Sequence, residues 1–198
     1  MITKQQYETL KKEFGKVASF AVWKNDIDDL DFFSRFDDFD KEQQNAKLPD
    51  DSPIYVFVAL NPAKTIGRDF ESFHCGKSKD YLLRNCLKDT KFWGSYITDL
   101  FKDKDLVTAD RSELNKKLKE SPRHYEDAAM RALSREIEIL ETGNGKKYVV
   151  LIVVGKTTWN YFKQFENGLY LPRPAICVPH YSQNQLTHKI IENLAKII

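Results

Sequence analysis

Two polar turns, each following an apolar run, carry the residues best suited to chemistry. Asn61 opens the turn Asn-Pro-Ala directly after Ile54–Leu60, and His180 lies in the turn Pro-His-Tyr-Ser directly after Ala175–Val178. Open α/β sheets bind ligands at the carboxyl ends of their strands, where the strand order reverses. A carboxamide and an imidazole from two such turns can hold a planar heterocycle by the polar groups on its edge. The sequence therefore predicts a small cleft between Asn61 and His180.

Strands and helices are expected to alternate along the segments that carry these turns. Apolar runs predict strands over Ile54–Leu60, Tyr148–Val154 and Ala175–Val178, and alternation of apolar and polar residues predicts another over Ser95–Leu100. Helical spacing predicts helices near residues 3–16, after Ser78, over Ala128–Glu141 and Thr157–Phe165, and after Leu186. Strands that alternate with helices favour a parallel sheet covered on both faces. We therefore expect an α/β fold with three αβα layers around a central, mainly parallel four-stranded sheet.

The domain organisation follows from length and local pattern. A chain of 198 residues suits one domain, so we expect a single domain over residues 1–198, with 1–53 as a helical, acidic N-terminal extension. Thr3 and Gln6 have the spacing of a capping box. Residues 102–125 are charged and irregular, and Pro122 is expected to break any helix there. Asp26, Asp28 and Asp31 hint at a calcium loop, but the turn glycine and closing glutamate are absent, so no metal is expected.

The charge is distributed unevenly along the chain. Between Asp26 and Asp51, ten acidic residues stand against three basic ones, a balance of −7, so with +2 overall the remainder carries +9. A basic body suits a polyanionic partner, while an ordinary solvated surface explains the pattern equally well. The sequence has no apolar stretch near the roughly 20 residues needed to span a bilayer. Three cysteines give no disulfide framework, so we expect a cytoplasmic protein without a membrane partner.

The segment Gly155-Lys156-Thr157 follows a strand and opens a helix, as the end of a phosphate-binding loop does. The full motif requires another glycine five residues earlier, where this chain has Val150. Nucleotide hydrolysis of that kind is therefore not expected. The amides at the helix start can still hold one phosphate beside Lys156. A plain helix cap with a solvated lysine is the alternative.

Five segments that follow one another from Ile54 onward form a recognisable series. They are Val58–Ala63, Phe73-His74, Gly94–Leu100, Val149–Gly155 and Val178–Ser182. Together they resemble the uracil-DNA glycosylase superfamily, and most closely its mismatch-specific uracil/thymine branch. In order, they match that family's first motif, its stacking aromatic, a strand ending in Thr-Asn-Leu, the strand–glycine–helix unit and the second motif.

The resemblance implies a role for each site residue. Asn61 would orient the attacking water, His180 would donate a hydrogen bond to an oxygen of the departing base, and Phe73 would stack on the base. The base pocket would also include Leu60, Pro62 and Ala63. The contacts to DNA would come from Lys64, Gly155, Lys156, Thr157, Ser182 and Gln183. No metal or cofactor is implied.

The function expected from the resemblance is hydrolysis of the N-glycosidic bond of uracil or a related deaminated base in DNA, by a monofunctional, monomeric glycosylase. The chain departs from the family at Ala63, where glycine is usual, and at Tyr181, where proline is usual. It also lacks a clear apolar wedge after Ser182 and the four cysteines of the iron–sulfur relatives. A catalytically inactive module that binds DNA or a nucleotide, and an enzyme acting on free nucleosides or nucleotides, stay open as alternatives.

Each key residue also has a purely structural interpretation. Asn61 can simply close its own turn, because Asn-Pro is a frequent turn start. Phe73 can anchor its loop to the core, and His180 can bond the backbone of its turn.

Overall fold

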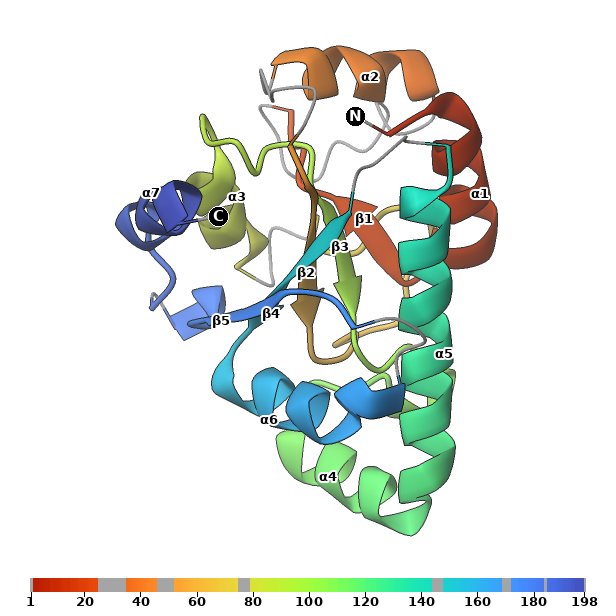
Figure 1. The fold of residues 1–198 in the computed structure, drawn as a ribbon. Coiled ribbons are helices and arrows are strands. Elements are labelled where there is room, and N and C mark those ends of the chain that lie inside the picture. The colour runs from red at the N-terminus through yellow and green to blue at the C-terminus, as the bar shows by residue number, and fades with distance from the viewer. Residues whose placement is uncertain are drawn as a thin grey trace.

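The computed structural model describes residues 2–24, 35–45, 52–74, 79–143, 148–168, 172–183 and 185–197. Its centre is a five-stranded sheet in the order β1-β3-β2-β4-β5 (Figure 1). The strands are β1 (Ala18–Phe20), β2 (Ile54–Ala59), β3 (Tyr96–Asp99), β4 (Val149–Val154) and β5 (Ala175–Val178).

Four strands, β2 to β5, run parallel, as the sequence predicts, and β1 pairs antiparallel with β3. The expected count of four strands is wrong, because β1 adds a fifth at the edge. Its three residues, Ala-Ser-Phe, are too few to show a periodic pattern, and the strand forms where β3 offers it an open edge.

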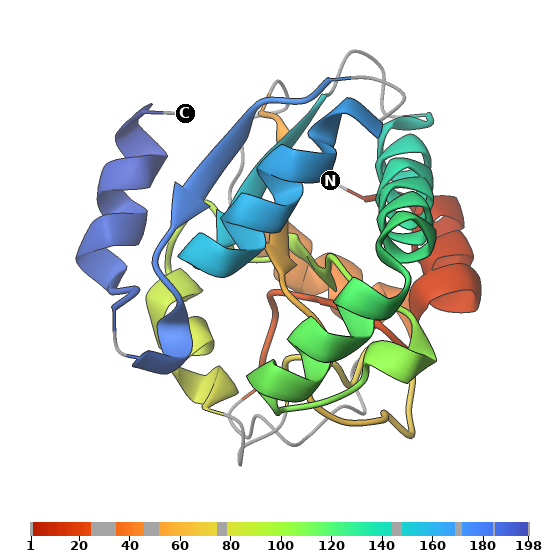
Figure 2. The same ribbon diagram turned by 90° about the horizontal axis from the view of Figure 1, so that it is seen from below.

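Helices cover both faces of the sheet. One face packs on α1 (Lys4–Phe14), α4 (Arg111–Glu120), α5 (Pro122–Glu141) and α6 (Lys156–Phe165). The other face packs on α3 (Asp80–Leu87) and α7 (His188–Ile197). Figure 2 shows α3 and α7 on one side of the sheet and α1 and α5 on the other. The two cores form because alternate strand residues point to opposite faces, with Val56 and Val58 in one and Tyr55 and Phe57 in the other.

The strand order reverses beside β2. The chain passes from β2 through α3 to β3 on one side of β2, and then returns through α5 to β4 on its other side. The connections that leave β2 and β4 therefore diverge in opposite directions at the carboxyl edge of the sheet. Such a divergence opens the crevice in which open α/β sheets bind ligands.

Residues 102–125 are more regular than the sequence predicts. After a short 3-10 turn at Lys104–Leu106, α4 begins behind Asp110, whose side chain accepts hydrogen bonds from the amides of Ser112 and Glu113. Pro122 does not break a helix but starts α5, because proline at the first helical position lacks only an amide that would be unbonded there. Helix α4 was missed because its buried stripe is just Leu114 and Leu118.

The N-terminal residues pack into the same core as the rest of the chain. The predicted capping box of Thr3 and Gln6 is present at the start of α1. Tyr7 from α1, Phe20 from β1 and Phe39 from α2 (Phe36–Asn45) meet Phe70 in one aromatic cluster, with ring centroids 4.3–5.8 Å apart. The Ser19 hydroxyl also donates to the Phe70 carbonyl at 2.8 Å. These contacts hold the loop that follows β2.

The described ranges contain neither a membrane-spanning helix nor a metal-binding cluster. They contain no helix with the length and apolar content to cross a membrane. They also contain no group of three or more histidine, cysteine, aspartate or glutamate residues placed to hold a metal ion. Asp26, Asp28 and Asp31, weighed above as a calcium loop, lie outside the described residues.

Candidate functional site

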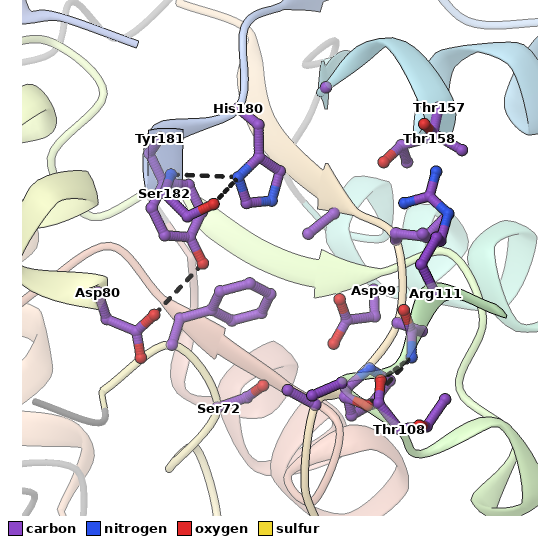
Figure 3. A pocket seen from close by; sticks show the side chains of 18 of the residues that line it. Ser72, Asp80, Asp99, Thr108, Arg111, Thr157, Thr158, His180, Tyr181 and Ser182 are labelled. Carbon is purple, nitrogen blue, oxygen red and sulfur yellow. Dashed lines mark hydrogen bonds between the residues drawn. The ribbon is translucent and has the colours of Figure 1, made fainter. Parts of the chain in front are cut away.

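A cavity of about 1100 Å³ lies at the carboxyl edge of the sheet, where the strand order reverses (Figure 3). Its walls come from the loop after β2, the end of β3, the starts of α3, α4 and α6, and the turn after β5. The structure brings Asn61 and His180 together as two of its lining residues. Leu60, Pro62 and Ala63 line the cavity with them.

The side-chain nitrogen of Asn61 is held entirely by backbone carbonyls. Its Nδ2 donates to the carbonyls of Leu106 and Thr108, both at 2.9 Å, and to that of Pro62 at 3.2 Å. Three acceptors around one group identify it as the NH₂ end of the amide, because a carbonyl oxygen there would have no donor. The Oδ1 atom has no hydrogen-bond partner among the described residues, so it remains available as an acceptor at the cavity.

His180 has a fixed proton position. Its Nδ1 accepts the backbone N–H of Ser182 at 3.1 Å and lies 2.8 Å from the Ser182 hydroxyl. A nitrogen that accepts an amide proton carries none itself, so the neutral ring bears its proton on Nε2. Burial lowers the pKa of His180, and the positive charge of Arg111 lowers it further. Nε2 forms no hydrogen bond within the described part of the chain, and is therefore a free donor.

The ring of Tyr181 stacks on one face of the His180 imidazole and supports it. The two rings stack with centroids 4.7 Å apart and planes 19° apart, and the Tyr181 hydroxyl donates to the Asp80 carboxylate at 3.3 Å. Burial next to Asp80 raises the pKa of Tyr181, so the phenol keeps its proton. The aromatic residue therefore stiffens the turn by packing, where the proline of the resembled family would stiffen it by its ring.

Gly155 brings the start of α6 against His180. It has φ +89°, and a Cβ there would lie 3.3 Å from Cδ2 of His180 and 3.4 Å from its Cβ. Its amide also donates to the Val178 carbonyl at 2.7 Å, which joins the end of β5 to this helix start. Both the backbone conformation and the close approach require glycine here.

One wall of the cavity attracts anions. No side chain caps α6, so amides of its first turn have no partner from the helix itself, and Lys156, Thr157 and Thr158 line the cavity there. Arg111 stands beside Thr157 and Thr158 (Figure 3) and is exposed, with no carboxylate partner in the described ranges. Sequence reasoning missed Arg111 because nothing local links the first residue of α4 to β4.

Two buried carboxyl groups face the same space. Asp80 is 3% exposed, starts α3 and accepts from Tyr181, while Asp99 is 2% exposed and ends β3. Burial raises the pKa of Asp99 to about 8; Lys102 opposes this shift, and Glu136 and Asp80 add to it. An acidic residue closing an apolar parallel strand is the sequence signal that would have found Asp99.

A buried ion pair supports the end of β3 beneath the cavity. The ammonium group of Lys102 lies 2.9 Å from Oε2 of Glu136, which is fully buried on α5. Oε1 of Glu136 accepts from the hydroxyls of Thr98 at 2.7 Å and Tyr96 at 2.9 Å. Lys102 also donates to the backbone carbonyl of Asp99. The network ties α5 to β3 and so fixes where the Asp99 backbone lies.

Phe73 lines the cavity in a strained conformation. Its φ is +65°, and Phe70 three residues earlier has φ +58°. Such angles cost a non-glycine residue about 1–3 kcal/mol and tend to occur at functional loops. The Trp23 indole donates to the Phe73 carbonyl at 3.2 Å, and the half-buried Phe73 ring packs against the core beneath α3. The residue therefore anchors its loop and also presents part of its ring to the cavity.

The other residues expected at the site fall into three groups: those that line the cavity, one that supports His180, and one whose side chain is not described. Lys64, Gly155, Lys156 and Thr157 line the cavity. Ser182 lines it too, but its hydroxyl lies against His180 Nδ1, which makes it a support for the imidazole. The side chain of Gln183 lies outside the described residues.

Comparison of the chain with protein-family models, with curated protein sequences and with solved structures finds no match. The geometry of the cavity is therefore the basis for assigning a function.

Proposed function

We propose that this protein is a DNA glycosylase that hydrolyses the N-glycosidic bond of uracil or a related deaminated base, with the fold type of the uracil-DNA glycosylases. One observation carries the proposal: a free acceptor on Asn61 and a free donor on a neutral His180 share a cavity large enough for a nucleotide. Each group is oriented by backbone atoms, so neither has to reorganise when a base enters.

The reaction begins with extrusion of the nucleotide from the stack, because the glycosidic bond is inaccessible inside a duplex. Extrusion costs a few kcal/mol. Stacking on the exposed part of Phe73 offsets about 1–3 kcal/mol of that cost. The anion-attracting wall of Arg111 and the start of α6 holds the flanking phosphates, and such contacts position the strand without reading its sequence.

Bond cleavage is assisted at both ends of the glycosidic bond. The C1′–N bond breaks with its electron pair leaving on the base, and His180 Nε2–H stabilises the negative charge that develops on a base oxygen. Oδ1 of Asn61 accepts a hydrogen bond from the water that adds to C1′, and that water releases its proton to solvent. An amide orients water but does not take its proton, so turnover is expected to be slow.

This last point favours one alternative, a catalytically inactive module that binds DNA or a nucleotide in the same cavity. In that case the protein binds DNA with an affinity that falls as salt rises, and releases no base.

Base release from oligonucleotides tests the proposal. We expect alkali-labile breaks at uracil, hypoxanthine, xanthine or mismatched thymine after incubation with the protein. Asn61→Ala removes the water-orienting oxygen and should lower release at least about 100-fold, the scale on which single preorganised polar groups act. Circular dichroism checks that the variant is folded. Binding without release from any of these substrates would support the inactive module instead.

A further inference from the structure

Arg111 and His180 lie on opposite walls of the cavity. Figure 3 shows Arg111 beside Thr157 and Thr158, with the imidazole of His180 on the other side. Arg111 is the first residue of α4, is exposed, and has no carboxylate partner within the described part of the chain. A guanidinium without an anion beside it is available to a phosphate, which it binds by charge-assisted hydrogen bonds. One ligand can therefore contact both side chains.

The contacts of His180 oppose a positive charge on its ring. The neutral ring carries its proton on Nε2, so a second proton must go to Nδ1, which accepts the amide of Ser182 at 3.1 Å. The amide hydrogen would then face the added one. The Ser182 hydroxyl, 2.8 Å from Nδ1, can turn to accept the second proton, because a hydroxyl is both donor and acceptor. The imidazolium is therefore disfavoured, but it can form.

Charged and titratable groups approach His180 from every element around it. The hydroxyl of Tyr181, whose ring stacks on the imidazole, donates to Asp80 of α3. Lys79, just before α3, donates to the Ser182 carbonyl at 3.2 Å. Other such groups line the cavity after β2, at the end of β3 and at the start of α6: Lys64, Asp99 and Lys156. Among the described residues, no carboxylate pairs with the imidazole to hold a positive charge on it.

Arg111 adds an electrostatic effect to these contacts. Burial lowers the pKa of His180, and the positive charge of Arg111 lowers it further. A like charge disfavours the charged form of its neighbour, and an anion that pairs with the guanidinium cancels that repulsion. The imidazole then takes up a proton more readily. By linkage, a protonated His180 strengthens the binding of the anion by the same factor.

We propose that Arg111 is a positioning residue that makes the charge of His180 depend on a phosphate of the substrate: it keeps the imidazole neutral until a phosphate pairs with the guanidinium, and the imidazole then becomes a stronger base. The inference rests on the proposed glycosylase function and names a regulation of that site. Nε2 carries a proton in both states, so the donor to the base is kept. A free base or nucleoside brings no phosphate and leaves His180 neutral.

The test is a pH titration of the His180 ring by nuclear magnetic resonance, without and with sulfate at equal ionic strength. Sulfate stays doubly charged through the titration, and the His180 signal is identified by its loss in His180→Gln. In the wild type, sulfate should raise the midpoint by about half a pH unit, the scale of one charge acting through a wet cavity. Arg111→Gln should raise it by a similar amount without sulfate, and sulfate should then add little. Arg111→Lys keeps the charge and should restore the wild-type response.

Lys119→Gln is the matched control, because Lys119 is an exposed cation on the same helix that does not line the cavity. It should leave the midpoint of His180 unchanged. The exposed rings of His124 and His188 are internal controls, and Arg111→Gln should not move their midpoints. A midpoint of His180 that stays in place in Arg111→Gln, or that moves equally in Lys119→Gln, contradicts the role of Arg111. An equal response to sulfate in the wild type and in Arg111→Gln places the anion elsewhere and rejects the coupling.

The same titration with an oligonucleotide separates this inference from the proposed function. An oligonucleotide that contains 2′-fluoro-2′-deoxyuridine resists cleavage, and free 2′-deoxyuridine lacks the phosphate. The midpoint should rise with the oligonucleotide and stay in place with the nucleoside. A rise in a protein that releases no base from any substrate supports the coupling and favours the inactive binding module. Base release without any rise rejects the coupling and leaves the glycosylase proposal intact.

Discussion

At the residue scale, Asn61 and His180 are held in the same way: one polar atom of each side chain bonds the backbone, and the other remains available to a ligand. In Asn61 the Nδ2 group bonds three carbonyls and leaves Oδ1 available, and in His180 the Nδ1 atom bonds the Ser182 amide and leaves Nε2–H available. The structural and functional interpretations of these residues are therefore compatible, since the atoms that close the turns are not those that face a ligand. Ala63, which replaces the usual glycine of the resembled family, is exposed.

The substitution Asn61→Asp tests this orientation. A carboxylate at position 61 would meet the carbonyls of Pro62, Leu106 and Thr108 without a proton to share. We expect it to lower the free energy of unfolding by about 2–3 kcal/mol at pH 7, because acceptors are left unbonded. Urea denaturation measures the change. A stability equal to that of the wild type would show that the amide is not held in this way.

At the element scale, the site depends on the joint between β4 and α6. Gly155 makes the turn with positive φ, bonds the end of β5 and leaves room for His180, so one residue sets the distance between the helix start and the imidazole. The end of β3 is fixed in a comparable way by Glu136 and Lys102, which connect it to α5. The walls of the cavity are thus attached to the sheet itself.

Gly155→Ala should lower base release much more than it lowers stability. The new Cβ strains the backbone and pushes against His180 at 3.3 Å, which displaces the Nε2 donor. Gly143→Ala is the matched control, because Gly143 also has positive φ, at +78°, but nothing lies within 4 Å of its added Cβ. Both variants should lose about 1 kcal/mol of stability to the backbone conformation. Equal activity in the two variants would contradict the assigned contact with His180.

At the scale of the whole molecule, a five-stranded sheet with helices on both faces places every wall of the cavity at one edge. The N-terminal residues, which the sequence sets apart by their acidity, supply β1 and part of the aromatic core that holds the loop after β2. The same arrangement places the carboxyl group of Asp99, a residue 2% exposed, at the buried end of β3.

The stability of the whole molecule should therefore depend on pH through Asp99. Burial raises the pKa of Asp99 from its ordinary value of 3.8 to about 8, so between about pH 4 and pH 8 the unfolded chain ionises this group while the folded protein does not. Stability is lost as pH rises through that window, by up to about 1.4 kcal/mol per pH unit. Asp99→Asn should remove this loss, so its advantage over the wild type grows from pH 4 to pH 8 in denaturant titrations. A constant difference across that range would contradict an elevated pKa.

The sequence alone determined the main elements and the two polar turns. The strands β2 and β4 are continuous apolar runs that only a sheet covered on both faces can bury, α1 follows from its capping box and apolar spacing, and α7 follows from its apolar spacing. Such signals are readable because residues within one element produce them. By the same local reasoning, Asn61 and His180 stand in the turns that follow the apolar runs of β2 and β5.

Features that depend on residues far apart in the chain could be found from the folded structure alone. The edge strand β1 exists because β3 pairs with it, and Asp99 and Arg111 belong to the cavity because the strand order brings β3 and the start of α4 to the same edge. The proton on Nε2 of His180 and the orientation of the Asn61 amide are set by backbone groups that folding places around them. No local pattern specifies such contacts, because their energy comes from pairing across the fold.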